Sequence, residues 1–155
     1  WFSYISIKFA GLHIARRCTP FNKIKKMSWD IVLFNSKQRI DSIAELDESQ
    51  LEPIDFSEIL ESSFNRINKS KNHREIVGKD FTIDFFVDNE HSSNFMLSLH
   101  GENGIYALIE LAKKHNWQIY DSGIDKMVDL ENPEKNGFKN HENYVSQILN
   151  NSNET

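Results

Sequence analysis

Residues 80–100 read DFTIDFFVDNEHSSNFMLSLH, and this stretch decides the predicted fold. Apolar and polar residues alternate along Phe81–Val87 and again along Asn94–His100, which is the period of a strand with one buried face. The polar residues Asp88–Ser92 between them form a loop of suitable length for a hairpin. The stretch therefore predicts two adjacent antiparallel strands.

The apolar residues also predict how these two strands pair. If Phe81 lies opposite Leu99, all the large apolar side chains of the hairpin fall on one face. A slip of one residue would divide them between both faces and is excluded by the loss of burial, whereas a slip of two residues keeps the pattern and stays open. In this register the other face carries Asp80 beside His100, and it also carries Asp84.

The rest of the chain supplies further strands and helices around this hairpin. Asp55 and Glu58 have the spacing of a helix capping box, and an apolar stripe at helical spacing follows them as far as Ile67. The helix is expected to fade within Asn68–Asn72. The other expected elements are a first strand at Trp29–Phe34, a polar connection at Asn35–Pro53, a helix at Ile105–His115, short strands at Trp117–Asp121 and Lys126–Leu130, and a last helix at Asn140–Leu149.

The order of these elements predicts an α+β protein built as a two-layer sandwich. Strand, helix, strand, strand, helix, strand is the β-α-β-β-α-β order of ferredoxin-like folds, here with a short extra strand and a C-terminal helix. Two helices would cover one face of the sheet. The other face would be open unless the last helix or a partner covers it.

The charge is divided between two parts of the chain. Residues 1–26 hold six basic residues and no acid, and they contain the single cysteine, Cys18. Subtracting those six from the 18 basic residues of the chain leaves 12 against 23 acids, so residues 27–155 carry −11. The first 26 residues are interpreted as an extension outside the domain, either upstream sequence before a start at Met27 or an organelle transit peptide.

A single domain is expected over residues 27–150, with a frayed tail at residues 151–155. The charge of −11 on this part argues against a nucleic-acid binder and against an anionic membrane surface, and it suits a basic protein partner. No apolar run approaches the ~20 residues that a membrane span needs. The expectation is a cytoplasmic protein without a cofactor.

Two kinds of site are predicted on the open sheet face. In the first, Asp80 orients His100 as a general base, although no nucleophile motif accompanies the pair. No spacing of carboxylates or histidines matches a known metal site. In the second, a partner-binding surface uses four acids and one aromatic residue: Asp80, Asp84, Tyr120, Asp121 and Asp129.

Four segments carry a resemblance to known proteins: Met27–Asp30, Gly78–Phe85, Met96–Gly101 and Trp117–Asp121. They resemble a group of small, uncharacterised bacterial cytosolic proteins that begin Met-Ser-Trp-Asp, some of them immunity-like. The resemblance covers about Met27–Leu149 and none of residues 1–26. It implies an immunity-like role and supplies no catalytic residue.

The leading hypothesis is therefore a small acidic binding protein of the immunity or inhibitor type that engages a basic protein through the open sheet face. One alternative is a small enzyme that uses Asp80 and His100. The other is a self-associating structural module, in which a homodimer buries the open face.

Overall fold

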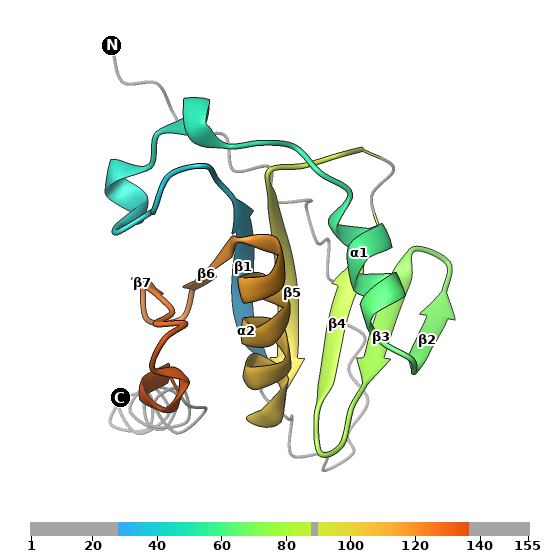
Figure 1. The fold of residues 1–155 in the computed structure, drawn as a ribbon. Coiled ribbons are helices and arrows are strands. Elements are labelled where there is room, and N and C mark those ends of the chain that lie inside the picture. The colour runs from blue at the N-terminus through green and yellow to red at the C-terminus, as the bar shows by residue number, and fades with distance from the viewer. Residues whose placement is uncertain (1–27, 88–89, 137–155) are drawn as a thin grey trace, which may run out of the picture.

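The computed structural model describes residues 28–87 and 90–136, which contain a seven-stranded sheet and two α-helices (Figure 1). The helices, α1 (Phe56–Ser63) and α2 (Asn103–His115), lie on one face of the sheet (Figure 1). The sheet is antiparallel, with the order β2-β3-β4-β5-β1-β6-β7. Its strands are β1 (Trp29–Asn35), β2 (Ile67–Ser70), β3 (His73–Val77), β4 (Thr82–Phe86), β5 (Asn94–His100), β6 (Trp117–Asp121) and β7 (Lys126–Met127). The predicted α+β class is confirmed.

The order of elements along the chain differs from the predicted one. Two additional strands, β2 and β3, stand between α1 and β4, so four consecutive strands separate the two helices. The predicted first strand, β1, lies inside the sheet, because it pairs with β5 on one side and with β6 on the other. Residues 1–26 and the predicted last helix, Asn140–Leu149, lie outside the described residues.

The core fills the space between the sheet and the two helices. On β1, Trp29, Ile31 and Leu33 point towards the helices and are at most 1% exposed. Phe56 at the start of α1 packs its ring against Trp117 of β6, with ring centroids 4.9 Å apart. Burial of these large side chains supplies the main stabilisation of the fold.

The helix α1 begins as predicted and ends earlier than predicted. Asp55 caps it, because its Oδ1 accepts a hydrogen bond from the backbone N–H of Glu58 at 2.9 Å. The predicted apolar stripe continued to Ile67, but Ile67 instead lies in β2, opposite Ile76 of β3. The tight turn between these strands includes Lys71, whose φ is 51°.

The helix α2 follows β5 through a glycine turn. Gly101 has a φ of 95°, and a Cβ at this position would stand 2.4 Å from the backbone oxygen of Asp80, so the turn requires glycine. Glu102 occupies the cap position of α2 without a side-chain hydrogen bond. None of the described helices is long and apolar enough to cross a membrane.

The β4–β5 hairpin keeps the predicted faces and changes the predicted register. Thr82 lies opposite His100, and Asp84 lies opposite Ser98, so the pairing is shifted by two residues from the predicted one. A shift of two leaves every side chain on its expected face, and for this reason burial alone could not distinguish the two registers. The shift decides which polar groups meet on the other face.

Candidate functional site

The candidate site lies on the sheet face opposite α1 and α2, which we call the polar sheet face. It is formed by the strand residues that alternate with the core residues, and neither α1 nor α2 lies on it (Figure 1). Its residues relevant here are Asp30, Val32, His73, Glu75, Asp84, Phe86, Met96, Ser98, His100 and Tyr120.

One row of this face runs across four strands and is rich in carboxylates. We call it the carboxylate row: Glu75 of β3, Asp84 of β4, Ser98 of β5 and Asp30 of β1 lie opposite one another in turn. Glu75 Oε2 accepts a hydrogen bond from Asn68 Nδ2 at 2.7 Å. Asp30 Oδ1 accepts one from Ser98 Oγ, also at 2.7 Å. These bonds hold the carboxylates in place across the sheet.

Asp84, in the middle of this row, contacts two histidines. His73 Nε2 lies 2.8 Å from Asp84 Oδ1, and His100 Nε2 lies 3.1 Å from Asp84 Oδ2. The side chain of His73 is 37% exposed, and those of Asp84 and His100 are each 22% exposed. His73 Nε2 is hydrogen-bonded to Asp84 Oδ1, and His100 Nε2 lies within ion-pair distance of Asp84 Oδ2. His100 Nδ1 is buried without a hydrogen-bond partner among the described residues.

The predicted pairing of Asp80 with His100 is wrong. Asp80 precedes β4 in an exposed turn with a φ of 66°, and the shifted register places Thr82 opposite His100. Asp84 takes the place that the prediction gave to Asp80. A carboxylate–imidazole contact therefore exists on this face, but both carboxylate oxygens are already occupied by histidine.

The structure also gives the contacts of two other predicted partner-binding acids, Asp121 and Asp129. Asp121 is only 4% exposed, and its Oδ2 accepts a hydrogen bond from Trp29 Nε1 at 2.8 Å. It points to the helix side because it follows Tyr120, and neighbouring residues of a strand face opposite ways. Asp129 follows β7 and accepts hydrogen bonds from the backbone N–H groups of Glu131 and Asn132, which stabilise a turn. The placement of Asp121 in the predicted partner-binding surface is wrong, whereas the placement of Asp129 there stays a prediction.

Tyr120 lies on the polar sheet face, opposite Val32 of β1. Its hydroxyl donates a hydrogen bond to Asp125 Oδ1 at 2.6 Å. Partial burial, together with the nearby Asp125 carboxylate, raises the pKa of Tyr120 to about 12. The side chain is therefore neutral at physiological pH and offers an aromatic surface with a fixed hydroxyl.

A second row on the same face is apolar, and we call it the apolar row: Phe86, Met96, Val32 and Tyr120. Val32 lies opposite Met96 on one side and opposite Tyr120 on the other. Phe86 stands two residues beyond Asp84, as Met96 stands two residues before Ser98, so both lie at the same end of the hairpin. Phe86 is 53% exposed and Met96 is 43% exposed, and they are the large hydrophobic residues that the described part of the chain leaves exposed.

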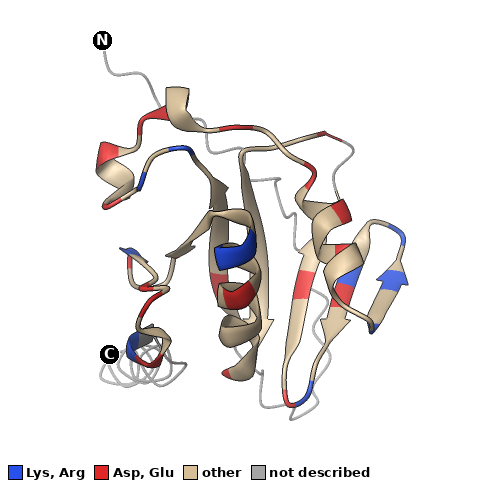
Figure 2. Cartoon of the chain, viewed as in Figure 1, with Lys and Arg blue, Asp and Glu red and all other residues tan. Residues whose placement is uncertain are grey.

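The charges near these rows have one sign. The strand residues on this face include Asp30, Glu75 and Asp84, and the described strands place no Lys or Arg beside them. Lys69, Arg74 and Lys126 all alternate to the helix side. In Figure 2 the central strands β1 and β4 accordingly carry acidic segments and no basic one.

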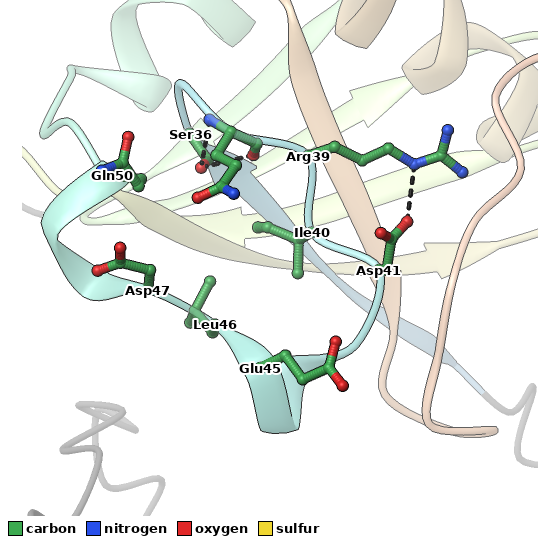
Figure 3. Close-up of a pocket in the computed structure, with 9 residues that line it drawn as sticks. Ser36, Arg39, Ile40, Asp41, Glu45, Leu46, Asp47 and Gln50 are labelled. Atoms are coloured by element: carbon green, nitrogen blue, oxygen red, sulfur yellow. Dashed lines mark hydrogen bonds and ion pairs between the residues drawn. The ribbon is translucent and has the colours of Figure 1, made fainter.

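Two cavities lie elsewhere on the molecule. The first, of about 130 Å³, is lined by residues of the loop that follows β1, including Ile40, Glu45 and Asp47 (Figure 3). Arg39 beside it is paired with Asp41 at 2.8 Å (Figure 3). The second, of about 670 Å³, is lined by α1 and α2 residues on the helix side. In the described ranges no group of three His, Cys, Asp or Glu residues could hold a metal ion.

The chemistry of the polar sheet face follows from its own residues. Comparison of the chain with models of protein families, with curated proteins and with solved structures finds no match. The carboxylate row can accept hydrogen bonds from Lys and Arg side chains, and the apolar row beside it can bury their neighbours. Sequence alternation pointed to Asp84, Phe86 and Tyr120 on this face, but it gave no sign of the His73 contact, because β3 itself was not predicted.

Proposed function

We propose that the protein is a small acidic binding protein of the immunity or inhibitor type that acts in the cytoplasm. It engages a basic protein partner through the polar sheet face. The observation that carries the proposal is the juxtaposition of the exposed Phe86 and Met96 with the carboxylate row, on strands whose Lys and Arg residues all point to the other side.

The two rows have complementary roles in such an interface. Exposed aromatic and methionine side chains are the residues that act as anchors when a partner buries them. Flanking carboxylates increase the association rate with a positively charged surface and disfavour acidic partners. Phe86 and Met96 would therefore supply affinity, and Asp30, Glu75 and Asp84 would supply selectivity.

The alternative of a small enzyme has less support from the contacts around Asp84. Both of its oxygens contact a histidine, and Ser98 Oγ, the hydroxyl of the row, donates to Asp30. No hydroxyl in this arrangement donates to a histidine nitrogen, which activation of a nucleophile would need. A self-associating module would bring the same three carboxylates face to face, which like-charge repulsion opposes.

Affinity capture from the native host tests the proposal when face variants are run beside the wild-type protein. Phe86→Ser/Met96→Ser removes the anchors, and Asp30→Asn/Glu75→Gln removes two charges while keeping the hydrogen-bond acceptors. Glu110→Gln, at an exposed position of α2, is the matched control. We expect a basic protein that the wild type and the control retain and both double variants lose, with retention falling as salt rises. Equal retention by all four proteins would show that the polar sheet face is not the interface.

A further inference from the structure

We propose that the element of the partner that docks on this face is a basic amphipathic α-helix, lying across the strands along the apolar row. This inference rests on the proposed function and specifies the shape of the partner. It follows from the spacing of the two rows and from the distribution of charge between them.

The spacing along the apolar row matches the spacing of side chains on a helix. Neighbouring paired strands are about 4.8 Å apart, so the two steps from Met96 on β5 through Val32 on β1 to Tyr120 on β6 cover about 10 Å. On a helix, residues three or four apart are separated by about 4.5–6 Å along the axis, and 10 Å corresponds to roughly seven residues. A helix across the strands therefore places one apolar residue over each of these three members of the row, and its next turn extends towards Phe86 on β4.

The carboxylate row lies beside the apolar row at a distance that suits the flank of the same helix. Asp84 and Phe86 are two residues apart on β4, and Asp30 and Val32 are two apart on β1, so the rows are separated by about 7 Å. Asp84 and Asp30 are two strands apart, or about 10 Å, which is the rise between helix residues i and i+7. Lys or Arg at those helix positions would meet the carboxylates while the apolar stripe covers Phe86 and Met96.

Two other occupants fit this face less well. An extended segment laid along the rows would present side chains of one face every ~7 Å, which does not match the strand spacing of about 4.8 Å. A second copy of the chain would set the carboxylates Asp30, Glu75 and Asp84 against themselves. The basic helix is the occupant that satisfies both spacing and charge.

The test uses fluorescently labelled model peptides and the full chain. The probe is a capped Leu/Lys peptide of about four turns, with Leu at positions i, i+3, i+4 and i+7. One control has the same composition with Leu and Lys alternating, and the other replaces every Lys of the helical pattern with Glu. Fluorescence anisotropy gives the dissociation constants for the wild type, Phe86→Ser/Met96→Ser and Glu110→Gln, each first checked for folding by circular dichroism.

We expect the helical Leu/Lys peptide to bind the wild type at least about tenfold more tightly than either control peptide. Phe86→Ser/Met96→Ser should weaken that binding by a similar factor, and Glu110→Gln should leave it unchanged. If the alternating peptide binds equally well and the same double variant abolishes its binding, the helix inference is wrong and the proposed function stands. If the Glu peptide binds equally well, if no peptide binds, or if the double variant does not change the binding, both the helix inference and the proposed function are wrong.

Discussion

Asp84 is the residue on which the geometry of the polar sheet face depends most, because its two oxygens hold two histidines from different strands. His73 reaches it from β3 at 2.8 Å, and His100 reaches it from β5 at 3.1 Å. The contact thus joins three strands at the centre of the carboxylate row. Losing the carboxylate would leave two partly buried imidazoles without their polar partner.

Asp84→Ala should lower the free energy of unfolding by about 1–3 kcal/mol, because partly buried polar groups left unpaired carry a desolvation cost. Asp80→Asn is the matched control, since Asp80 is exposed and Asn tolerates its φ of 66°. The control should change the free energy of unfolding by less than about 0.5 kcal/mol. Urea unfolding measures both values. Equal losses in the two variants would contradict the assignment of Asp84, rather than Asp80, as the partner of His100.

At the scale of the elements, Glu61 connects α1 to the β2–β3 hairpin. Its Oε1 accepts a hydrogen bond from Arg74 Nε of β3 at 2.6 Å, and its Oε2 contacts Lys69 Nζ of β2. The Lys69 ammonium and the Arg74 guanidinium hold the pKa of the Glu61 carboxyl below its usual range, although partial burial opposes them. One short helix and one edge hairpin are thereby fixed to each other by a single carboxylate.

The lowered pKa of Glu61 predicts how this link responds to acid. A carboxyl whose folded pKa is depressed stabilises the protein above its unfolded value, about 4.3, and the stabilisation is lost as pH falls through the folded pKa. Glu61→Gln should therefore cost about 1 kcal/mol at neutral pH, and the difference from wild type should shrink below pH ~4. Urea unfolding at a series of pH values measures this difference. A difference that is the same at pH ~3 and pH ~7 would show that the carboxylate charge is not involved.

The elements differ in how far the sequence could predict them. Alternation along Phe81–Val87 predicted the buried face of β4 correctly. A shift of two residues leaves the same side chains buried, so the partner of His100 was assigned wrongly. The edge strand β2 was missed because three of its four residues are polar and exposed, which is the composition of a loop. Asp121 was assigned to the wrong side of the sheet because a charged side chain is expected to be exposed to solvent. In the structure the indole N–H of Trp29 donates a buried hydrogen bond to Asp121, which the sequence does not reveal.

At the scale of the whole molecule, the separation of charge between the two sides of the sheet is the main feature. The strand residues Lys69, Arg74 and Lys126 lie on the helix side, whereas Asp30, Glu75 and Asp84 lie on the polar sheet face. The apolar row therefore stays exposed within a field of one sign. The carboxylates would then have two effects, attracting a basic partner and preventing the exposed apolar residues from pairing with a second copy.

This double effect predicts the oligomeric state. The wild-type protein should sediment as a monomer over a concentration series at low ionic strength, because facing carboxylates repel one another. Asp30→Asn/Glu75→Gln should self-associate at high concentration, since Phe86 and Met96 remain exposed while two charges are gone. Adding Phe86→Ser should restore the monomer. Sedimentation velocity on the three proteins distinguishes these states, and a wild-type dimer that Phe86→Ser dissolves would instead identify a second copy of the chain as the occupant of this face.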